Sequence, residues 1–155
     1  MGKINVVLVN PEIPQNTGNI SRTCAVTGAA LHIVRPTGFE ISDRTLKRAG
    51  LDYWDKLDLT YYDGIDEFIR LHGEDKLYFF TSHTENRFDK ADLTGDVYLI
   101  FGRESVGLDA ELLMKYREQT LRIPMRSNVR CLNLSNAVAV AVYESLRVNG
   151  YNGLE

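Results

Sequence analysis

Six short runs of β-branched, aromatic and leucine-rich sequence recur along this 155-residue chain, separated by stretches of helical character. Continuous apolar runs of this kind are typical of strands that are covered on both faces, as in parallel sheets. The predicted strands are Ile4–Val9, Leu31–Val34, Leu57–Tyr61, Leu77–Thr81, Val97–Phe101 and Leu121–Pro124. Their alternation with helices favours an α/β fold, a parallel sheet flanked by helices in three layers.

Four of the intervening segments predict helices, at Thr17–Thr27, Asp43–Ala49, Ile65–Leu71 and Asp109–Tyr116. A fifth element follows the last strand, and its period is ambiguous because the sequence AVAVAV at 137–142 alternates as a strand would. We predict a helix, since Asn133 or Ser135 can cap its start and Asn149-Gly150 can end it. Its inward stripe would consist of Leu134, Val138, Ala141, Val142 and Ser145.

Composition bounds the class of protein. A hydrophobic fraction of 44% and a charged fraction of 25% are ordinary for a globular chain. The length is that of one domain, so residues 1–155 are expected to form a single domain. No stretch approaches about 18 consecutive apolar residues, and Cys24 and Cys131 form neither a CxxC motif nor a disulfide framework. We therefore expect a cytoplasmic protein with free thiols and no membrane partner.

The formal net charge of −3 argues weakly against a nucleic-acid partner, but the charges are unevenly distributed. Eight acidic residues lie between Asp52 and Asp75, whereas cations gather in two groups. These groups are Arg44, Lys47 and Arg48, and Arg122, Arg126 and Arg130. Two interpretations remain open, solvated charge scattered by chance and a basic face on an acidic protein.

Ligands of open parallel sheets bind beyond the carboxyl ends of the strands. Three segments of polar and glycine-containing sequence follow predicted strands, namely Asn10–Arg22, Gly102–Gly107 and Met125–Asn133. The end of the fourth strand, Phe80-Thr81-Ser82, would contribute as well. We therefore expect a site that is assembled from several loops.

In the first of these segments, Asn16, Asn19 and Arg22 recur every three residues and share one face of a beginning helix. A helix cap with a surface arginine would explain the pattern. Alternatively, the fork of donors on Arg22 would bind a phosphate or a ribose.

The second segment is neither a GxGxxG motif nor a P-loop, because no lysine follows Gly107. Gly102 permits close approach of a ligand to the backbone, and Glu104 could accept hydrogen bonds or hold an arginine. A plain strand-to-helix turn is equally consistent. In the third segment, backbone groups could recognise an adenine edge, and Arg126 and Arg130 could contact phosphates.

Metal and nucleophilic chemistry find little support in the sequence. His32, His72 and His83 lack the spacing of metal ligands, and His32 lies inside a strand pattern. No GxSxG motif is present, and Cys131 has no evident histidine partner. We predict no metal site.

Together, the three segments resemble the SpoU branch of the SPOUT superfamily, RNA ribose 2′-O-methyltransferases that use S-adenosylmethionine. Asn16 and Arg22 match the first motif of that family, and Gly102–Leu108 matches the second, G-x-E-x-x-G-L after a strand. The third motif, I-P-M followed by S-L-N-x-S-N-A, matches Ile123–Met125 and Leu132–Ala137. Cys131 departs from it, since serine is usual at that position.

The resemblance implies a deep trefoil knot in the C-terminal half and a homodimer. The short chain and the sequence PEIPQNTGN at 11–19 look like one subgroup, the minimal tRNA methyltransferases. These modify the wobble nucleotide, cytidine or a modified uridine, in leucine tRNAs. The implied partner is the anticodon stem-loop of a tRNA.

The resemblance also assigns residues. The S-adenosylmethionine pocket would use Phe80, Thr81, Gly102, Glu104, Ile123, Met125, Cys131, Leu132 and Ser135. Catalysis would involve Arg22, Asn16 and Asn133, with Tyr143 contributed across the dimer, although an isolated tyrosine is more often a core or interface residue. RNA contacts would come from Arg22, Arg48, Arg126 and Arg130.

Two other functions fit parts of the pattern. One is a non-catalytic RNA-binding homodimer that keeps the fold, with Cys131 as the suspicious feature. The other is a small α/β protein that binds an adenosine nucleotide as a sensor. Methyl transfer to RNA would distinguish the methyltransferase from both of these alternatives.

Overall fold

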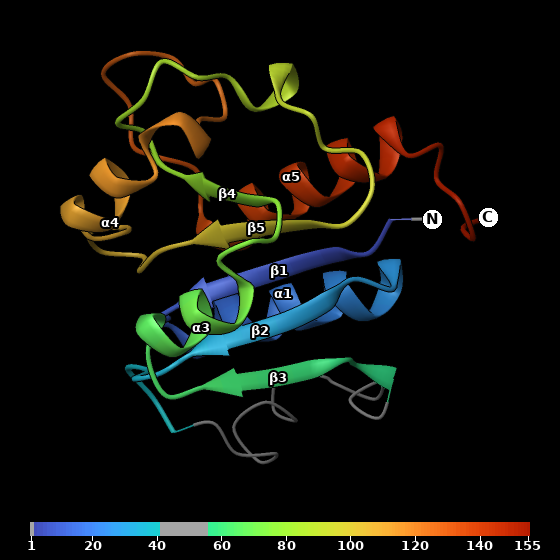
Figure 1. The fold of residues 1–155 in the computed structure, drawn as a ribbon, viewed down its shortest axis with the longest axis horizontal. Coiled ribbons are helices and arrows are strands. Elements are labelled where there is room, and N and C mark those ends of the chain that lie inside the picture. Colours follow the sequence, from blue (N-terminus) through green and yellow to red (C-terminus); the bar gives the residue numbers. More distant parts are fainter. Residues whose placement is uncertain (1, 41–55) are drawn as a thin grey trace.

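A computed structural model describes residues 2–40 and 56–155. Six parallel strands form one sheet in the order β3-β2-β1-β5-β4-β6, and the strand arrows labelled in Figure 1 all point toward the same edge. The strands are β1 Ile4–Val9, β2 Ala30–Val34, β3 Leu59–Tyr62, β4 Leu77–Phe80, β5 Val97–Phe101 and β6 Thr120–Leu121. The predicted parallel sheet is confirmed, and β1 and β5 match their predicted bounds.

Helices connect and flank the strands. They are α1 Pro14–Thr27, α3 Ile65–His72, α4 Ala110–Lys115 and α5 Leu134–Val148, with short 3-10 helices η2 Phe88–Lys90 and η3 Arg117–Gln119. The predicted helix Asp43–Ala49 lies outside the described residues. No helix in the described ranges is long and apolar enough to cross a bilayer.

β2, β3 and β4 differ from their predicted bounds by one or two residues, and the last predicted strand differs most. The expected run Leu121–Pro124 yields only the two-residue β6, which begins one residue earlier. Arg122 forms an isolated bridge with Arg87 instead of extending the pairing with β4. Pro124 has no backbone N–H to donate, so the ladder could not have continued through it. The chain therefore leaves the sheet early and is free to cross its edge.

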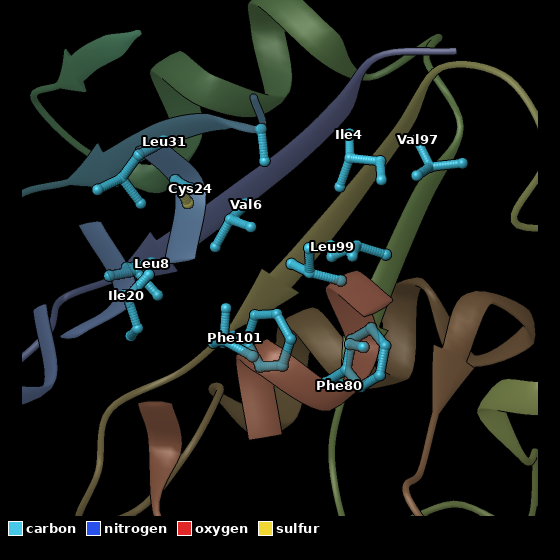
Figure 2. Close-up of a cluster of buried hydrophobic side chains, with 14 of the residues drawn as sticks. Ile4, Val6, Leu8, Ile20, Cys24, Leu31, Phe80, Val97, Leu99 and Phe101 are labelled. Carbon is cyan, nitrogen blue, oxygen red and sulfur yellow. The ribbon is translucent and has the colours of Figure 1, made fainter. Parts of the chain in front are cut away.

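Two helical layers cover the sheet. Ile20 and Cys24 of α1 belong to the core on one face, together with Val6 and other strand residues (Figure 2). Val142 of α5 belongs to the same core. On the other face, Phe68 of α3 packs with buried side chains of the same strands, and Leu112 and Leu113 of α4 flank that cluster. All six residues of β1 are buried, as expected for a strand covered on both faces.

The ambiguous AVAVAV sequence is helical. Four of the five residues in its predicted stripe are buried and Leu134 is half-buried, so the helical period describes α5 correctly. Ala141 and Val142 are fully buried in the same core as α1, against which α5 packs. Small side chains allow these two helices to lie close together on one face of the sheet.

β1 and β5 are neighbours from which the chain departs in opposite directions. After β1 it runs through α1 to β2, and after β5 it runs through α4 to β6 on the far side of β4. The two helices also pack on opposite faces. This is a topological switch point, where the loops diverge and leave room for a ligand.

A buried polar network crosses β1, β2 and β3. The side-chain amide of Asn5 donates to the carbonyls of Val97 and Lys3, so its oxygen points to His32 Nε2, 2.9 Å away. Nε2 therefore carries the proton, and Nδ1 accepts from the Tyr62 hydroxyl at 2.8 Å. Tyr62 also contacts His72, which reaches Asp75. His32 is thus structural and neutral.

Burial, and to a lesser extent the neighbouring His72, lower the pKa of His32 to about 4. In the unfolded chain the pKa of histidine is about 6.5. The unfolded state therefore binds this proton between about pH 6.5 and pH 4 while the folded state does not. Unfolding becomes easier across that window as the pH falls.

We expect the His32 contribution to lower the free energy of unfolding by about 3 kcal/mol between pH 6.5 and pH 4. Urea unfolding curves of the wild type and of His32→Gln at several pH values measure it. The wild type should lose stability relative to the variant as the pH falls. A difference between the two proteins that does not change with pH would contradict a neutral buried His32.

Candidate active site

A cavity of about 780 Å³ lies at the carboxyl ends of β4, β5 and β6 and is closed by the segment that leads into α5. Four stretches line it: residues 80–83 after β4, 101–108 after β5, the segment between β6 and α5, and the start of α1. The cavity is large enough for a ligand of nucleoside size. The predicted meeting of several loops is confirmed.

The Gly102–Gly107 turn forms one wall. Arg103 and Gly107 exchange backbone hydrogen bonds of 3.3 and 2.8 Å, which fold the turn back on itself. A Cβ on Gly102 would lie 2.2 Å from the carbonyl carbon of Gly107, so a side chain cannot be accommodated there without moving the turn. Gly107 has a φ of +71°, in the left-handed region. Both glycines are therefore required by the backbone geometry.

Glu104, on this turn, caps α1. Its carboxylate accepts the backbone N–H groups of Glu12 at 2.9 Å and Ile13 at 2.6 Å, and the side-chain amide of Asn16 at 3.3 Å. Ile13 is the N-cap residue and has no side chain that could cap the helix. A carboxylate at the positive end of a helix is also favoured by the helix dipole. The missing cap is thus supplied by a residue 91 positions away.

Asn16 and Asn133 extend these contacts to α5. The Asn133 amide donates to the Asn16 oxygen at 3.0 Å. The Asn133 oxygen in turn accepts the backbone N–H of Ser135 at 2.9 Å and of Asn136 at 3.4 Å, and the Ser135 hydroxyl at 2.5 Å. Asn133 is therefore the N-cap of α5, one of the two residues that the sequence offered.

This chain of hydrogen bonds has one possible direction. Glu104 can only accept, which turns the Asn16 amide group toward it and the Asn16 oxygen toward Asn133. At the other end, the first amides of α5 can only donate, which fixes the oxygen of Asn133. The three sequence motifs are therefore joined through defined side-chain orientations.

An aromatic pair packs beneath the cavity. Phe80 and Phe101 stack with ring centroids 4.6 Å apart (Figure 2), and both residues line the cavity. Ile123, Met125 and Leu132 add apolar surface. Such a lining suits the flat apolar face of a base, with backbone groups available for its polar edge.

The structure brings most of the predicted site residues together. Eleven of them line the cavity: Asn16, Phe80, Thr81, Gly102, Glu104, Ile123, Met125, Arg130, Cys131, Leu132 and Asn133. Ser135 is not among the lining residues and instead takes part in the cap of α5.

The remaining predicted residues lie outside the cavity lining. Arg22 is exposed on α1, Arg126 is exposed before α5, and Tyr143 is 45% exposed on α5. Arg48, with its neighbours Arg44 and Lys47, lies outside the described residues. Within a single chain, Arg22 and Tyr143, which were predicted to act in catalysis, are therefore not part of the cavity lining.

Sequence reasoning missed several residues of the site. His83 and Arg103 line the cavity, and Glu12 bonds to Ser105, which also lines it. Arg103 is bound to Asp109 at 2.7 Å. Ser82, which was predicted as part of the fourth strand's end, lines the cavity. The contact between Glu12 and Ser105 could not be predicted, because the two residues are 93 positions apart.

The two thiols differ. Burial raises the pKa of Cys24 to about 12, so this thiol is an inert part of the core. Cys131 is exposed and lines the cavity. Among the described residues, no group of three or more histidine, cysteine, aspartate or glutamate side chains could hold a metal ion.

Comparison with known proteins gives consistent results. The model of the SpoU rRNA methylase family matches residues 3–143. A protein of Burkholderia cenocepacia that is named tRNA (cytidine(34)-2′-O)-methyltransferase is 47% identical over 96% of this chain and 97% of its own length.

Two solved structures are also similar. One, described as giving insight into the 2′-OH methylation of C/U34 on tRNA, has a TM-score of 0.88 and 44% identity, and the match covers 94% of this chain and 95% of that one. The other is an AdoMet-bound rRNA methyltransferase from Sinorhizobium meliloti, with a TM-score of 0.83 and 25% identity. That match covers 95% of this chain and 57% of the other.

The cap of α5 can be tested through stability. Asn133→Ala removes the acceptor of two backbone donors and the partner of Asn16, and should lower the free energy of unfolding by about 1–2 kcal/mol. Asn133→Ser should recover most of the capping but not the bond to Asn16. Asn136→Ala, on an exposed neighbour, serves as the control. Equal denaturation midpoints for the alanine variant at 133 and the wild type would refute the role of Asn133.

Proposed function

The chain belongs to the SpoU rRNA methylase family, and we propose that it methylates the ribose 2′-hydroxyl of the wobble nucleotide, cytidine or a modified uridine, in leucine tRNAs. The name of the Burkholderia protein and the subject of the C/U34 structure support the tRNA and the position. The observation that carries the proposal is that all three motifs line one common cavity and are joined by hydrogen bonds.

The cavity fits S-adenosylmethionine. Its volume is sufficient, Gly102 gives the backbone close access, and the Phe80–Phe101 pair provides apolar support. Phe80, Thr81, Ile123, Met125, Cys131 and Leu132 would surround it. Contacts through the backbone at Cys131 do not need the serine that is usual in the family. When bound, S-adenosylmethionine supplies a sulfonium methyl group that needs no further activation.

Glu104 and Ser135 would act on the cofactor indirectly. The Glu104 carboxylate already accepts three hydrogen bonds from the start of α1, and the Ser135 hydroxyl donates to Asn133. Both residues therefore hold the walls of the cavity in place. We expect their replacement to disturb the alignment of α1 and α5.

Arg22 would bind the acceptor nucleotide. A guanidinium group keeps its proton at neutral pH, so it is unsuited to be the base that accepts the hydroxyl proton. Its fork of donors suits the ribose oxygens or the adjacent phosphate. As the 2′-oxygen bonds to the methyl carbon and the carbon–sulfur bond breaks, the hydroxyl proton would leave to phosphate or water. Asn16 and Asn133 would fix the reacting geometry.

Arginines near the cavity would hold the anticodon stem-loop. Arg130 lines the cavity, and Arg126 is exposed four residues earlier in the same loop. Together with Arg48 they would contact phosphates, which supply affinity without reading sequence. The bases of the exposed loop would supply the specificity.

The active unit would be a homodimer. Val140 and Tyr143 of α5 and Val26 of α1 are exposed, at 40%, 45% and 62%, on the two helices that cover one face. Across a two-fold axis, Arg22 of one subunit could border the same site as Arg130 and Tyr143 of its partner. Arg22 is not among the residues that line the cavity within one chain, which supports this division.

The C-terminal half would form the trefoil knot of the family. The segment at 122–133 runs from the sheet edge at β6 to α5, which packs beside α1 under β1 and β5. Such a crossing over the strand ends is what threading of the chain requires. We also expect the protein to act in the cytoplasm, where its tRNA substrates are found.

Methyl transfer tests the proposal directly. Labelled S-adenosylmethionine and tRNA from cells that lack this protein should give a 2′-O-methyl group at the wobble position of leucine tRNAs, mapped by nuclease digestion. Arg22→Ala should lower kcat by roughly 100-fold, the cost of removing one donor that acts on the reacting group. Arg22→Lys should recover only part, because it lacks the fork.

The outcomes separate the alternatives. Label at another nucleotide would keep the chemistry and reject the substrate. Saturable cofactor binding without transfer to any tRNA would reject the enzyme and favour the non-catalytic RNA-binding homodimer. Preference for ATP over S-adenosylmethionine would favour the nucleotide sensor.

Mixed dimers test the division of the site between subunits. When Arg22→Ala and Tyr143→Phe subunits are combined, one site of each heterodimer would keep both native residues and the other would lack both. We therefore expect the mixture to be more active than either variant alone. Activity no greater than the average of the two parents would place each site within one chain.

A further inference from the structure

We propose that Glu12 and Ser105 are positioning residues for methyl transfer, which hold the start of α1 against the Gly102–Gly107 turn and thereby align Asn16 and Arg22 with the cofactor cavity. The proposal rests on the methyltransferase function proposed above and concerns two residues to which the sequence analysis assigned no role.

The contact is reciprocal. Glu12 Oε1 accepts the backbone N–H of Ser105 at 3.1 Å and its hydroxyl at 2.6 Å. In the opposite direction, Glu104 accepts the backbone N–H groups of Glu12 and Ile13. Each loop thus presents a glutamate to the backbone of the other. We call these four hydrogen bonds the Glu12–Ser105 clamp.

Electrostatics favour the charged form of Glu12. The hydrogen bond from the Ser105 side chain lowers its pKa most, followed by the bond from the Ser105 backbone and by the charge of Arg103. Hydrogen bonds to an ionised acceptor are stronger than those between neutral groups. Glu12 therefore accepts both Ser105 bonds as a carboxylate at neutral pH, although Ser105 is exposed.

The position of the clamp gives it a role beyond stability. Glu104 and Ser105 line the cofactor cavity together with the rest of the Gly102–Gly107 turn, and the Ser105 hydroxyl donates to Glu12. Glu12 lies two residues before α1, the helix that carries Asn16 and Arg22. A rotation of α1 would displace the arginine from the ribose without opening the cavity. Misplacement by about 1 Å can cost two orders of magnitude in rate.

Loss of the clamp should therefore lower kcat and leave cofactor binding nearly unchanged. We expect Ser105→Ala and Glu12→Ala to lower kcat about tenfold at saturating tRNA and S-adenosylmethionine, with less than about a threefold change in the dissociation constant of S-adenosylmethionine. Ser105→Thr, which keeps the hydroxyl, should recover most of the rate. Glu74→Ala removes an exposed carboxylate after α3 and is the matched control.

A double-mutant cycle identifies the two residues as one unit. If they act through each other, Glu12→Ala/Ser105→Ala should lose no more rate than either single variant. Multiplied losses would overturn the clamp. A loss of cofactor affinity equal to the loss of rate would overturn it as well, since that would indicate damage to the cavity itself.

Hydrogen exchange separates failure of the clamp from failure of the proposed function. In Ser105→Ala, the backbone amides at the start of α1 should exchange faster than in the wild type, while those of α3 remain unchanged. If the wild type transfers no methyl group, the proposed function fails, and with it the positioning role. Unchanged exchange at α1 would overturn the clamp even in an active enzyme.

Discussion

The arrangement of the site depends on one carboxylate at the beginning of a helix that cannot cap itself. α1 begins after Pro11, Glu12 and Ile13, and Ile13 offers no side-chain acceptor. Glu104, on the turn after β5, accepts the backbone N–H groups of Glu12 and Ile13. The same carboxylate orients Asn16 toward Asn133 and the start of α5. Since an acceptor lies at one end of this series and helix donors at the other, every amide in it has a single orientation. The same hydrogen bonds therefore stabilise the helix starts and fix the geometry of the active site.

The topology of the sheet explains why these elements meet. β1 and β5 are adjacent at the switch point, so the turns that follow them are close although more than 90 residues separate them. β6 pairs at the outer edge, yet the next helix packs beside α1 on the face below β1 and β5. The intervening segment must cross the carboxyl ends of β4 and β5, and this crossing closes the cavity. Early termination of β6 before Pro124 supplies the length that the crossing needs.

Sequence alone could predict much of the fold, because periodicity is a local signal. It identified β1 and β5 residue for residue and the inward stripe of α5, in spite of the alternating AVAVAV run. It overextended the last strand, since whether Ile123 pairs is decided by its neighbours in the sheet. The sequence also could not predict that Glu104 caps α1, because the donors and the acceptor are distant in sequence. Ser135 was predicted to contact the cofactor, and its observed bond to Asn133 shows a structural use that spacing could not reveal.

The second motif illustrates what kind of catalyst such a site can be. Both charged side chains of the Gly102–Gly107 turn are already engaged, Glu104 by α1 and Arg103 by Asp109. The Glu104 carboxylate uses its acceptor capacity for three N–H groups that hold the start of α1. The turn therefore contributes geometry rather than acid–base chemistry. A site that contributes geometry in this way suits a reaction whose electrophile is already activated. The barrier then depends on how closely the hydroxyl oxygen and the methyl carbon are aligned.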